Sequence, residues 1–175
     1  MGVSYIRYMP KPVTRLLFIC LLLPTLTQAQ KLRDLYDISN GLMTTLTSAV
    51  DVSDSLFISI EEYHRLIDRQ PLNAAERSQY KSEVNDFYPD QQAEFLQSIK
   101  ELQKIYVSEI NRGVSIEMDT VRFKEVRGTA NIFEVQIEVV FKDDEGNRSY
   151  LYIDTMAASV RRRWSFISPI EEEYE

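Results

Sequence analysis

The feature that most constrains this chain is a change of hydrophobic period near Gly113. Before it, apolar residues recur at intervals of three and four, which is typical of helices with one buried face; after it, they alternate with polar residues, as in half-buried strands. The clearest strand is Ile132 to Phe141, where the apolar side chains share one face and the polar ones share the other. Helices followed by consecutive strands predict an α+β domain with an antiparallel sheet.

Two capping sequences predict where helices begin. Ser59 and Glu62, and again Asn73 and Glu76, stand three residues apart ahead of an apolar pattern. In such a pair the first side chain accepts a hydrogen bond from the third backbone amide, and the glutamate reaches back to the cap. We therefore expect one helix after Ser59 and another after Asn73.

Two breaks are expected to divide the helical half further. The run Ser-Asn-Gly at residues 39–41 interrupts the apolar pattern of residues 31–50. Pro89 is expected to end the short helix that follows Asn73, so that a separate long helix with the most regular apolar stripe begins at the next residue. Gly113 is well placed for the left-handed residue that closes this long helix.

The second half predicts a four-stranded antiparallel meander with the long helix packed on one face. The first strand changes phase near Asp119, which indicates a bulge. The loop from Lys142 to Ser149 holds acidic turn formers and a Gly-Asn pair, so it is expected to form a hairpin. A short last strand carries Trp164, which we expect to be buried against Phe95, Ile99 or Tyr106 of the long helix.

The segment around Leu16 to Leu23 indicates the compartment. This apolar run is much shorter than the roughly 20 residues of a membrane-spanning helix. Basic residues without acidic ones precede it, and small residues stand before a cleavage point at Ala29, as in a secretory signal. We expect residues 1–29 to be a cleaved signal peptide, residues 30–169 one domain and residues 170–175 a disordered acidic tail, in a periplasmic or secreted protein.

Cys20 raises the alternative of a lipoprotein. A lipid-modified cysteine normally follows a small residue, whereas bulky Ile19 precedes Cys20, so we interpret Cys20 as part of the apolar signal core. Cleavage after Ala29 would remove this only cysteine and leave 17 basic and 27 acidic residues, a net charge of −10. The mature domain then has no disulfide, thiolate metal site or cysteine nucleophile, and its charge disfavours nucleic acid as a partner.

The element order resembles known α+β folds. A helix followed by a curved four-stranded meander with Trp164 in its last strand, together with the segments ISIEEY (58–63) and RRRWSFIS (161–168), resembles the cystatin-like and nuclear-transport-factor-2-like folds among small exported bacterial proteins. The resemblance covers roughly residues 90–169. It implies the fold and no functional residues, because such folds serve as enzymes, binding modules and dimerisation domains.

The candidate binding residues are Arg161, Arg162, Arg163 and Trp164. They form the only dense positive cluster in an acidic chain, and guanidinium groups are suited to grip phosphate, sulfate or carboxylate groups. The alternative is structural: the arginine stems would cover apolar surface while their charges meet the acidic residues 171–173.

Two other polar features are interpreted as surface. His64, the only histidine, would share a helical face with Glu61 and Asp68, a geometry conceivable for a general base or a metal ligand, but one histidine does not make a common zinc site. The acidic run at residues 143–145 lacks the ligand spacing of a calcium loop. No phosphate loop or dinucleotide fingerprint occurs. We therefore expect no catalytic residue, metal or cofactor.

These features predict a small exported binding or assembly module that is not an enzyme, with an unknown protein or an anionic ligand as partner. The alternative is an enzyme or small-ligand binder that uses a pocket between the long helix and the concave sheet face. In that case Tyr106, Tyr150 or Tyr152 and an acidic group such as Asp154 would lie in the pocket. A homodimer joined through the open sheet face is a third possibility, because both phases of the third strand are partly apolar.

Overall fold

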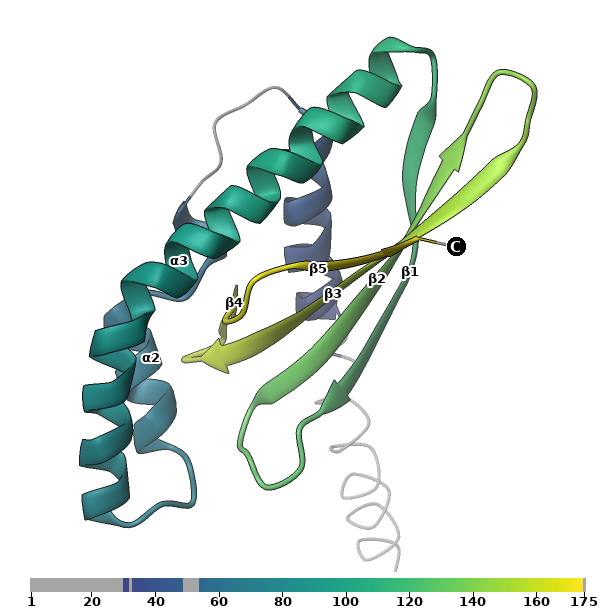
Figure 1. The fold of residues 1–175 in the computed structure, drawn as a ribbon. Coiled ribbons are helices and arrows are strands. Elements are labelled where there is room, and N and C mark those ends of the chain that lie inside the picture. The colour runs from purple at the N-terminus through teal and green to yellow at the C-terminus, as the bar shows by residue number, and fades with distance from the viewer. Residues whose placement is uncertain (1–29, 32, 49–53, 175) are drawn as a thin grey trace, which may run out of the picture. The chain divides into compact units, whose positions relative to one another are not determined.

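The computed structural model describes residues 30–31, 33–48 and 54–174 (Figure 1). The chain divides into two units, Met1–Leu35 and Tyr36–Glu175. The described residues of the first unit are helical. The predicted signal peptide, residues 1–29 with Cys20, lies outside the described residues. In the part of the chain that the structure does describe, no helix is both long and apolar enough to cross a membrane.

The second unit begins with helical residues 36–47, which run through the Ser-Asn-Gly sequence without a break. The expectation that residues 39–41 would interrupt the helix is therefore wrong. Leu42 and Leu46, one turn apart, are fully buried, and the burial of such side chains outweighs the cost of about 1 kcal/mol for one glycine in a helix.

Two further helices follow, after the short 3-10 turn η1 (Asp54–Leu56). Helix α2 (Ile60–Asp68) is capped by Ser59, whose side chain accepts a hydrogen bond from the backbone of the residue three positions on, at 3.3 Å. Helix α3 (Ala74–Asn111) begins with a complete capping box at Asn73, whose side chain and backbone both bond to Glu76. Both predicted helix starts are confirmed.

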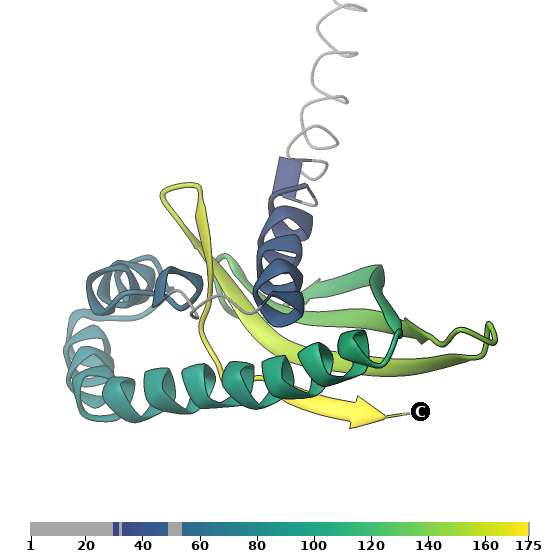
Figure 2. The ribbon, with the colours of Figure 1, turned by 90° about the horizontal axis from the view of Figure 1, so that it is seen from above.

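Helix α3 is one element with Pro89 in its interior, so the expectation that a helix ends at Pro89 is wrong. Proline lacks the amide hydrogen that an interior helical residue donates to the carbonyl four positions back, and such sites bend helices. Figure 2 shows α3 bending along its length. Val84 before the proline and Phe95 after it are both buried, so both arms of the bent helix cover apolar surface. Gly113 has a φ of +91°, which confirms it as the left-handed residue after the helix.

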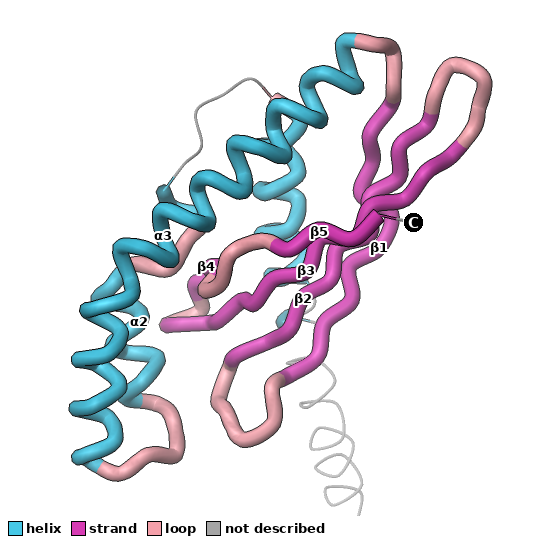
Figure 3. Tube along the Cα trace, viewed as in Figure 1, coloured by secondary structure: helices cyan, strands magenta, loops and turns pink. Residues whose placement is uncertain are grey.

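The strands form one antiparallel sheet in the order β1-β2-β3-β4, with β5 also paired to β3 (Figure 3). Their bounds are β1 (Ser115–Glu125), β2 (Ile132–Lys142), β3 (Arg148–Val160), β4 (Arg163–Phe166) and β5 (Glu171–Tyr174). Helices followed by an antiparallel sheet make the fold α+β, as the period change predicts. The predicted bulge in the first strand is also confirmed, because the β1–β2 register shifts between Met118 and Thr120.

Strand β5 corrects the prediction of a disordered tail at residues 170–175. Glu171–Tyr174 pair with β3, and Ile170 is buried. Pro169 has no amide hydrogen and separates β5 from β4. The hydroxyl of Ser168 accepts a hydrogen bond from the backbone of Met156 at 2.8 Å, which holds this break against β3.

Aromatic contacts show which sheet face the long helix covers. Phe95 of α3 lies 5.9 Å from Phe166 of β4 between ring centroids, and Tyr106 lies 5.2 Å from Phe141 of β2. Phe166 is fully buried, whereas Trp164 is only half-buried and its ring contacts the ring of Phe133 of β2 at a tilt. The expectation that Trp164 is buried against the long helix is therefore wrong, and Phe166 is the residue of β4 that packs against Phe95.

Candidate functional site

The turn between β3 and β4 consists of Arg161 and Arg162, because Val160 and Arg163 are already paired across the two strands. Both turn residues have positive φ, 52° and 67°, as in a type I′ turn. Asn and Gly are favoured there, since a side chain like that of arginine is strained in the left-handed region. Both arginines are exposed.

The structural explanation for these arginines predicted that their charges meet the acidic residues 171–173. Within the described residues, no ion pair reaches Arg161 or Arg162. Arg163 approaches Glu62 of α2, with 3.9 Å between Nη1 and Oε1, while its side chain is 81% exposed. The arginine cluster therefore faces water, and its charge is compensated within the described residues only by this one long pair.

A groove of about 840 Å³ lies directly beside the turn, between β4, the start of α2 and the middle of α3. Most of its lining is polar, and three aromatic residues form one part of it, called the aromatic floor below: Tyr88 and Trp164 are partly exposed, whereas Phe57, 5.9 Å from Tyr88 between ring centroids, is only 3% exposed. The hydroxyl of Tyr88 donates to the carbonyl of Ile58 at 2.9 Å, which fixes the ring in the groove.

The charged side chains that line this groove balance one another. Glu61 and Glu62 of α2 face Arg65 of the same helix and Arg163 of β4. The groove itself is thus close to neutral at pH 7, and the excess positive charge sits at one end, on Arg161 and Arg162 of the turn. Strand β4 therefore joins an electropositive turn to a groove lined by both polar and aromatic side chains.

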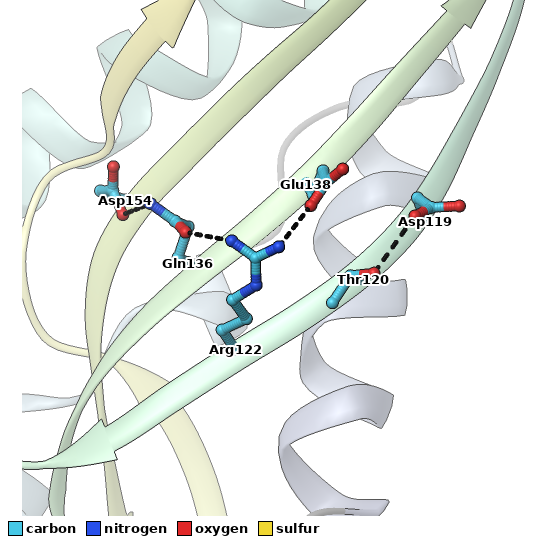
Figure 4. Close-up of polar contacts among 6 residues, drawn as sticks. All are labelled: Asp119, Thr120, Arg122, Gln136, Glu138 and Asp154. Atoms are coloured by element: carbon cyan, nitrogen blue, oxygen red, sulfur yellow. Dashed lines mark hydrogen bonds and ion pairs between the residues drawn. The ribbon is translucent and has the colours of Figure 1, made fainter.

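A second groove, of about 610 Å³, lies on the polar face of the sheet and reaches Glu94 of α3. Figure 4 shows how its polar side chains are linked across three strands. Arg122 donates to Gln136 at 3.4 Å and to Glu138 at 3.1 Å, and Gln136 in turn donates to Asp154 at 3.1 Å. Asp154 therefore lies on the polar face.

The tyrosines considered for a pocket lie on two sides of the sheet: Tyr150 and Tyr152 share the polar face with Asp154, and Tyr106 does not. Tyr106 is fully buried beside Phe141 on the apolar side of the sheet. Tyr152 pairs in register with Glu138, two residues before Asp154 on β3, so it belongs to the opposite, polar face. An arrangement of Tyr106 with Asp154 in one site is thus excluded by the sheet between them.

His64 and the acidic run have structural partners. The Nε2 atom of His64 lies 3.0 Å from Oδ1 of Asn85, which joins α2 to α3. The Asp143 carboxylate accepts hydrogen bonds from the side chain and the backbone of Asn147 in its own loop. These hydrogen bonds, chiefly the one from the side chain, hold the pKa of the Asp143 carboxyl below the usual range. Over the described ranges, no group of three or more histidine, cysteine, aspartate or glutamate side chains is placed to hold a metal ion.

The sequence locates the arginine cluster and Trp164 but does not show what surrounds them. Phe57 and Tyr88, which form the groove floor, come from a loop and from α3, far from β4 in the chain. The Arg122–Gln136–Asp154 link likewise depends on the register of three strands. The local sequence does not indicate the turn geometry, because Arg161 and Arg162 are not residues favoured at positive φ and the turn follows from the pairing of Val160 with Arg163.

No known protein family, curated protein or solved structure matches this chain.

Proposed function

We propose that the chain is a small exported binding or assembly module without catalytic activity, and that it holds an anionic group of its partner through Arg161, Arg162, Arg163 and Trp164. The likeness of residues 90–169 to cystatin-like and nuclear-transport-factor-2-like folds is part of this proposal. It concerns the fold alone, because such folds serve as enzymes, binding modules and dimerisation domains, and the binding role rests on the arginine turn.

The conformation of the β3–β4 turn is the observation that carries the proposal. Two arginines occupy positions where Asn and Gly would be more stable. Strain of this kind, on the order of 1 kcal/mol or more for each residue, is typical of functional sites. The strained turn holds two exposed guanidinium groups, each able to bind a carboxylate or phosphate through two parallel hydrogen bonds.

The proposal is tested by the fluorescence anisotropy of a labelled poly-L-glutamate chain titrated with the protein. The variant Arg161→Asn/Arg162→Gly removes both charges and suits the turn, so its fold is retained. We expect it to bind at least about tenfold more weakly, since hydrogen bonds between charged groups contribute about 1.5–3 kcal/mol each. Added salt should weaken the wild-type complex.

The matched control is Arg127→Gln/Arg148→Gln, which removes two exposed arginines, one in the β1–β2 turn and one at the start of β3. We expect this variant to bind poly-L-glutamate within about threefold of the wild type, because general attraction between charges is screened by salt. Equal weakening in both double variants would mean that only net charge matters and would contradict the proposed site.

A small-ligand binder or enzyme that uses the polar-face groove is the second candidate. Its volume of about 610 Å³ falls in the usual size range of small-molecule sites. Arg122 and Asp154 offer both signs of charge there. A thermal-shift screen of small amines and carboxylates would favour this candidate if a compound stabilised the wild type and failed to stabilise Asp154→Ala.

Export belongs to the same proposal and rests on the signal-like residues 1–29. In a host with a periplasm, mass spectrometry of the purified protein should show Gln30, or its cyclised form, as the first residue. Intact Met1, or a lipid on Cys20, would contradict the proposed export with cleavage after Ala29.

A further inference from the structure

The groove beside the turn differs in character from the turn itself. Arg161 and Arg162 place two positive charges at one end, whereas the adjoining groove carries two acidic and two basic side chains over a floor of Phe57, Tyr88 and Trp164. A ligand that fills both places meets positive charge at one end and, a short distance away, the partly exposed rings of Tyr88 and Trp164, which suit an apolar group. The turn and the groove are adjacent, because Arg163 and Trp164, which line the groove, follow Arg161 and Arg162 directly in the chain.

We infer that the occupant is an extended protein segment that sets acidic side chains against Arg161 and Arg162 and, a few residues on, an apolar side chain on Trp164. This inference rests on the proposed function and names the partner class for the same site. The half-buried indole of Trp164 and the ring of Tyr88 offer the apolar side chain a surface that is already ordered by Phe133 and Ile58. Aromatic anchors of this type carry much of the binding energy at protein interfaces.

The size of the groove favours a protein segment over a free anion. A small anion is held by donors that converge on one point, and a groove of about 840 Å³ with an aromatic floor would remain largely empty around it. The charge of the molecule favours a protein segment over a membrane. The chain carries a net charge of −7, so an anionic bilayer would repel most of its surface.

Two labelled peptides test the inference with the intact protein. Glu-Glu-Gly-Phe-Gly carries both groups, and Glu-Glu-Gly-Ala-Gly lacks the apolar one. We expect the phenylalanine peptide to bind at least about tenfold more tightly, because a buried aromatic side chain is removed from water. It should also shift the emission of Trp164, the only tryptophan, to shorter wavelength, whereas the alanine peptide should not.

Two variants locate the apolar contact. Gln92→Trp places a bulky side chain in the groove from a partly exposed helical position, and it should reduce the preference for the phenylalanine peptide to less than about threefold. Trp164→Ala should do the same. If Trp164→Ala fails to fold, the apolar contact is still tested by the Gln92→Trp variant and by the emission shift of the wild type, since both experiments leave β4 unchanged.

The outcomes separate this inference from the proposed function. Equal affinity for the two peptides, with both weakened by Arg161→Asn/Arg162→Gly, would overturn the apolar contact and leave the anionic site standing. Stronger binding of tripolyphosphate or of phosphatidylglycerol vesicles would overturn the protein segment as occupant. Salt-sensitive self-association that the same double variant abolishes would assign the groove to a second copy. If every anionic compound binds Arg161→Asn/Arg162→Gly as tightly as it binds the wild type, the proposed function itself is overturned.

Discussion

The ring of Trp164 lies 5.2 Å from the ring of Phe133 between centroids, with 53° between their planes. Phe133 is buried, and Trp164 covers it from the solvent side while remaining half-exposed. Phe166, two residues on, is fully buried against Phe95. The two aromatic residues of β4 thus have different roles: Phe166 belongs to the core, and the exposed part of Trp164 can contact a partner.

This difference predicts unequal costs of truncation. Phe166→Ala should lower the free energy of unfolding by about 3–5 kcal/mol, because it leaves a cavity in the core. Trp164→Ala should cost less, about 1–3 kcal/mol, since only part of the indole is removed from water. Urea denaturation of both variants measures the costs. A Trp164→Ala variant as unstable as Phe166→Ala would mean that Trp164 is a core residue.

The strained turn predicts a gain in stability when its arginines are replaced. Arg161→Asn/Arg162→Gly should raise the free energy of unfolding by about 1–2 kcal/mol, because both new residues accept positive φ more readily. Arg161→Lys/Arg162→Lys keeps the charge and the strain, so its urea midpoint should stay near that of the wild type. A less stable Asn-Gly variant would show that the arginines are present for structural reasons.

The side chain of Gln70 links the end of α2 to the β1–β2 loop. Its amide donates to the carbonyl of Ala130 at 3.1 Å and accepts from the amide of Ala130 at 2.8 Å. Gln70→Ala should cost about 1–3 kcal/mol, since it leaves both partly buried backbone groups without this partner. Gln79→Ala, on the exposed face of α3, should change stability by less than about 0.5 kcal/mol. Hydrogen exchange at the Ala130 amide should accelerate only in the Gln70 variant.

The β2–β3 hairpin predicts a contribution to acid sensitivity. Hydrogen bonds from the side chain and backbone of Asn147 lower the pKa of Asp143 in the folded state. Because the folded pKa lies below the unfolded one, the stabilisation is present above the unfolded pKa of about 4 and is lost as the pH falls through the folded value. Asp143→Asn should therefore lose less stability than the wild type between pH 6 and pH 3. An identical loss in urea titrations would contradict this assignment.

Local signals in the sequence predict much of the helical half. The cap at Asn73 and the glycine after α3 act within a few residues of the chain, so a short window contains the whole interaction. Pro89 shows where such a window is insufficient. Its local cost of about 3 kcal/mol favours a helix end, but Val84 and Phe95 are buried on either side of it. Packing of the whole helix outweighs the missing hydrogen bond.

The prediction of a disordered tail in place of strand β5 is wrong for a similar reason. The acidic run Glu171–Glu173 has the composition of a solvated tail, and nothing nearby in the sequence indicates a partner strand. The pairing with β3 and the burial of Ile170 depend on where Pro169 breaks the last strand. Of the candidate site, the sequence supplies the arginines and the tryptophan. The positive φ values and the aromatic floor follow from strand register and from the distant residues Phe57 and Tyr88.

The most direct test of the proposed function is to map poly-L-glutamate binding by amide chemical-shift changes in the isotope-labelled protein. We expect the largest changes at residues 161–165 and at the start of α2, and Arg161→Asn/Arg162→Gly should remove them. Changes centred on Arg122, Gln136 and Asp154 would instead place binding on the polar sheet face and contradict the proposed site. So would a spectrum that poly-L-glutamate leaves unchanged.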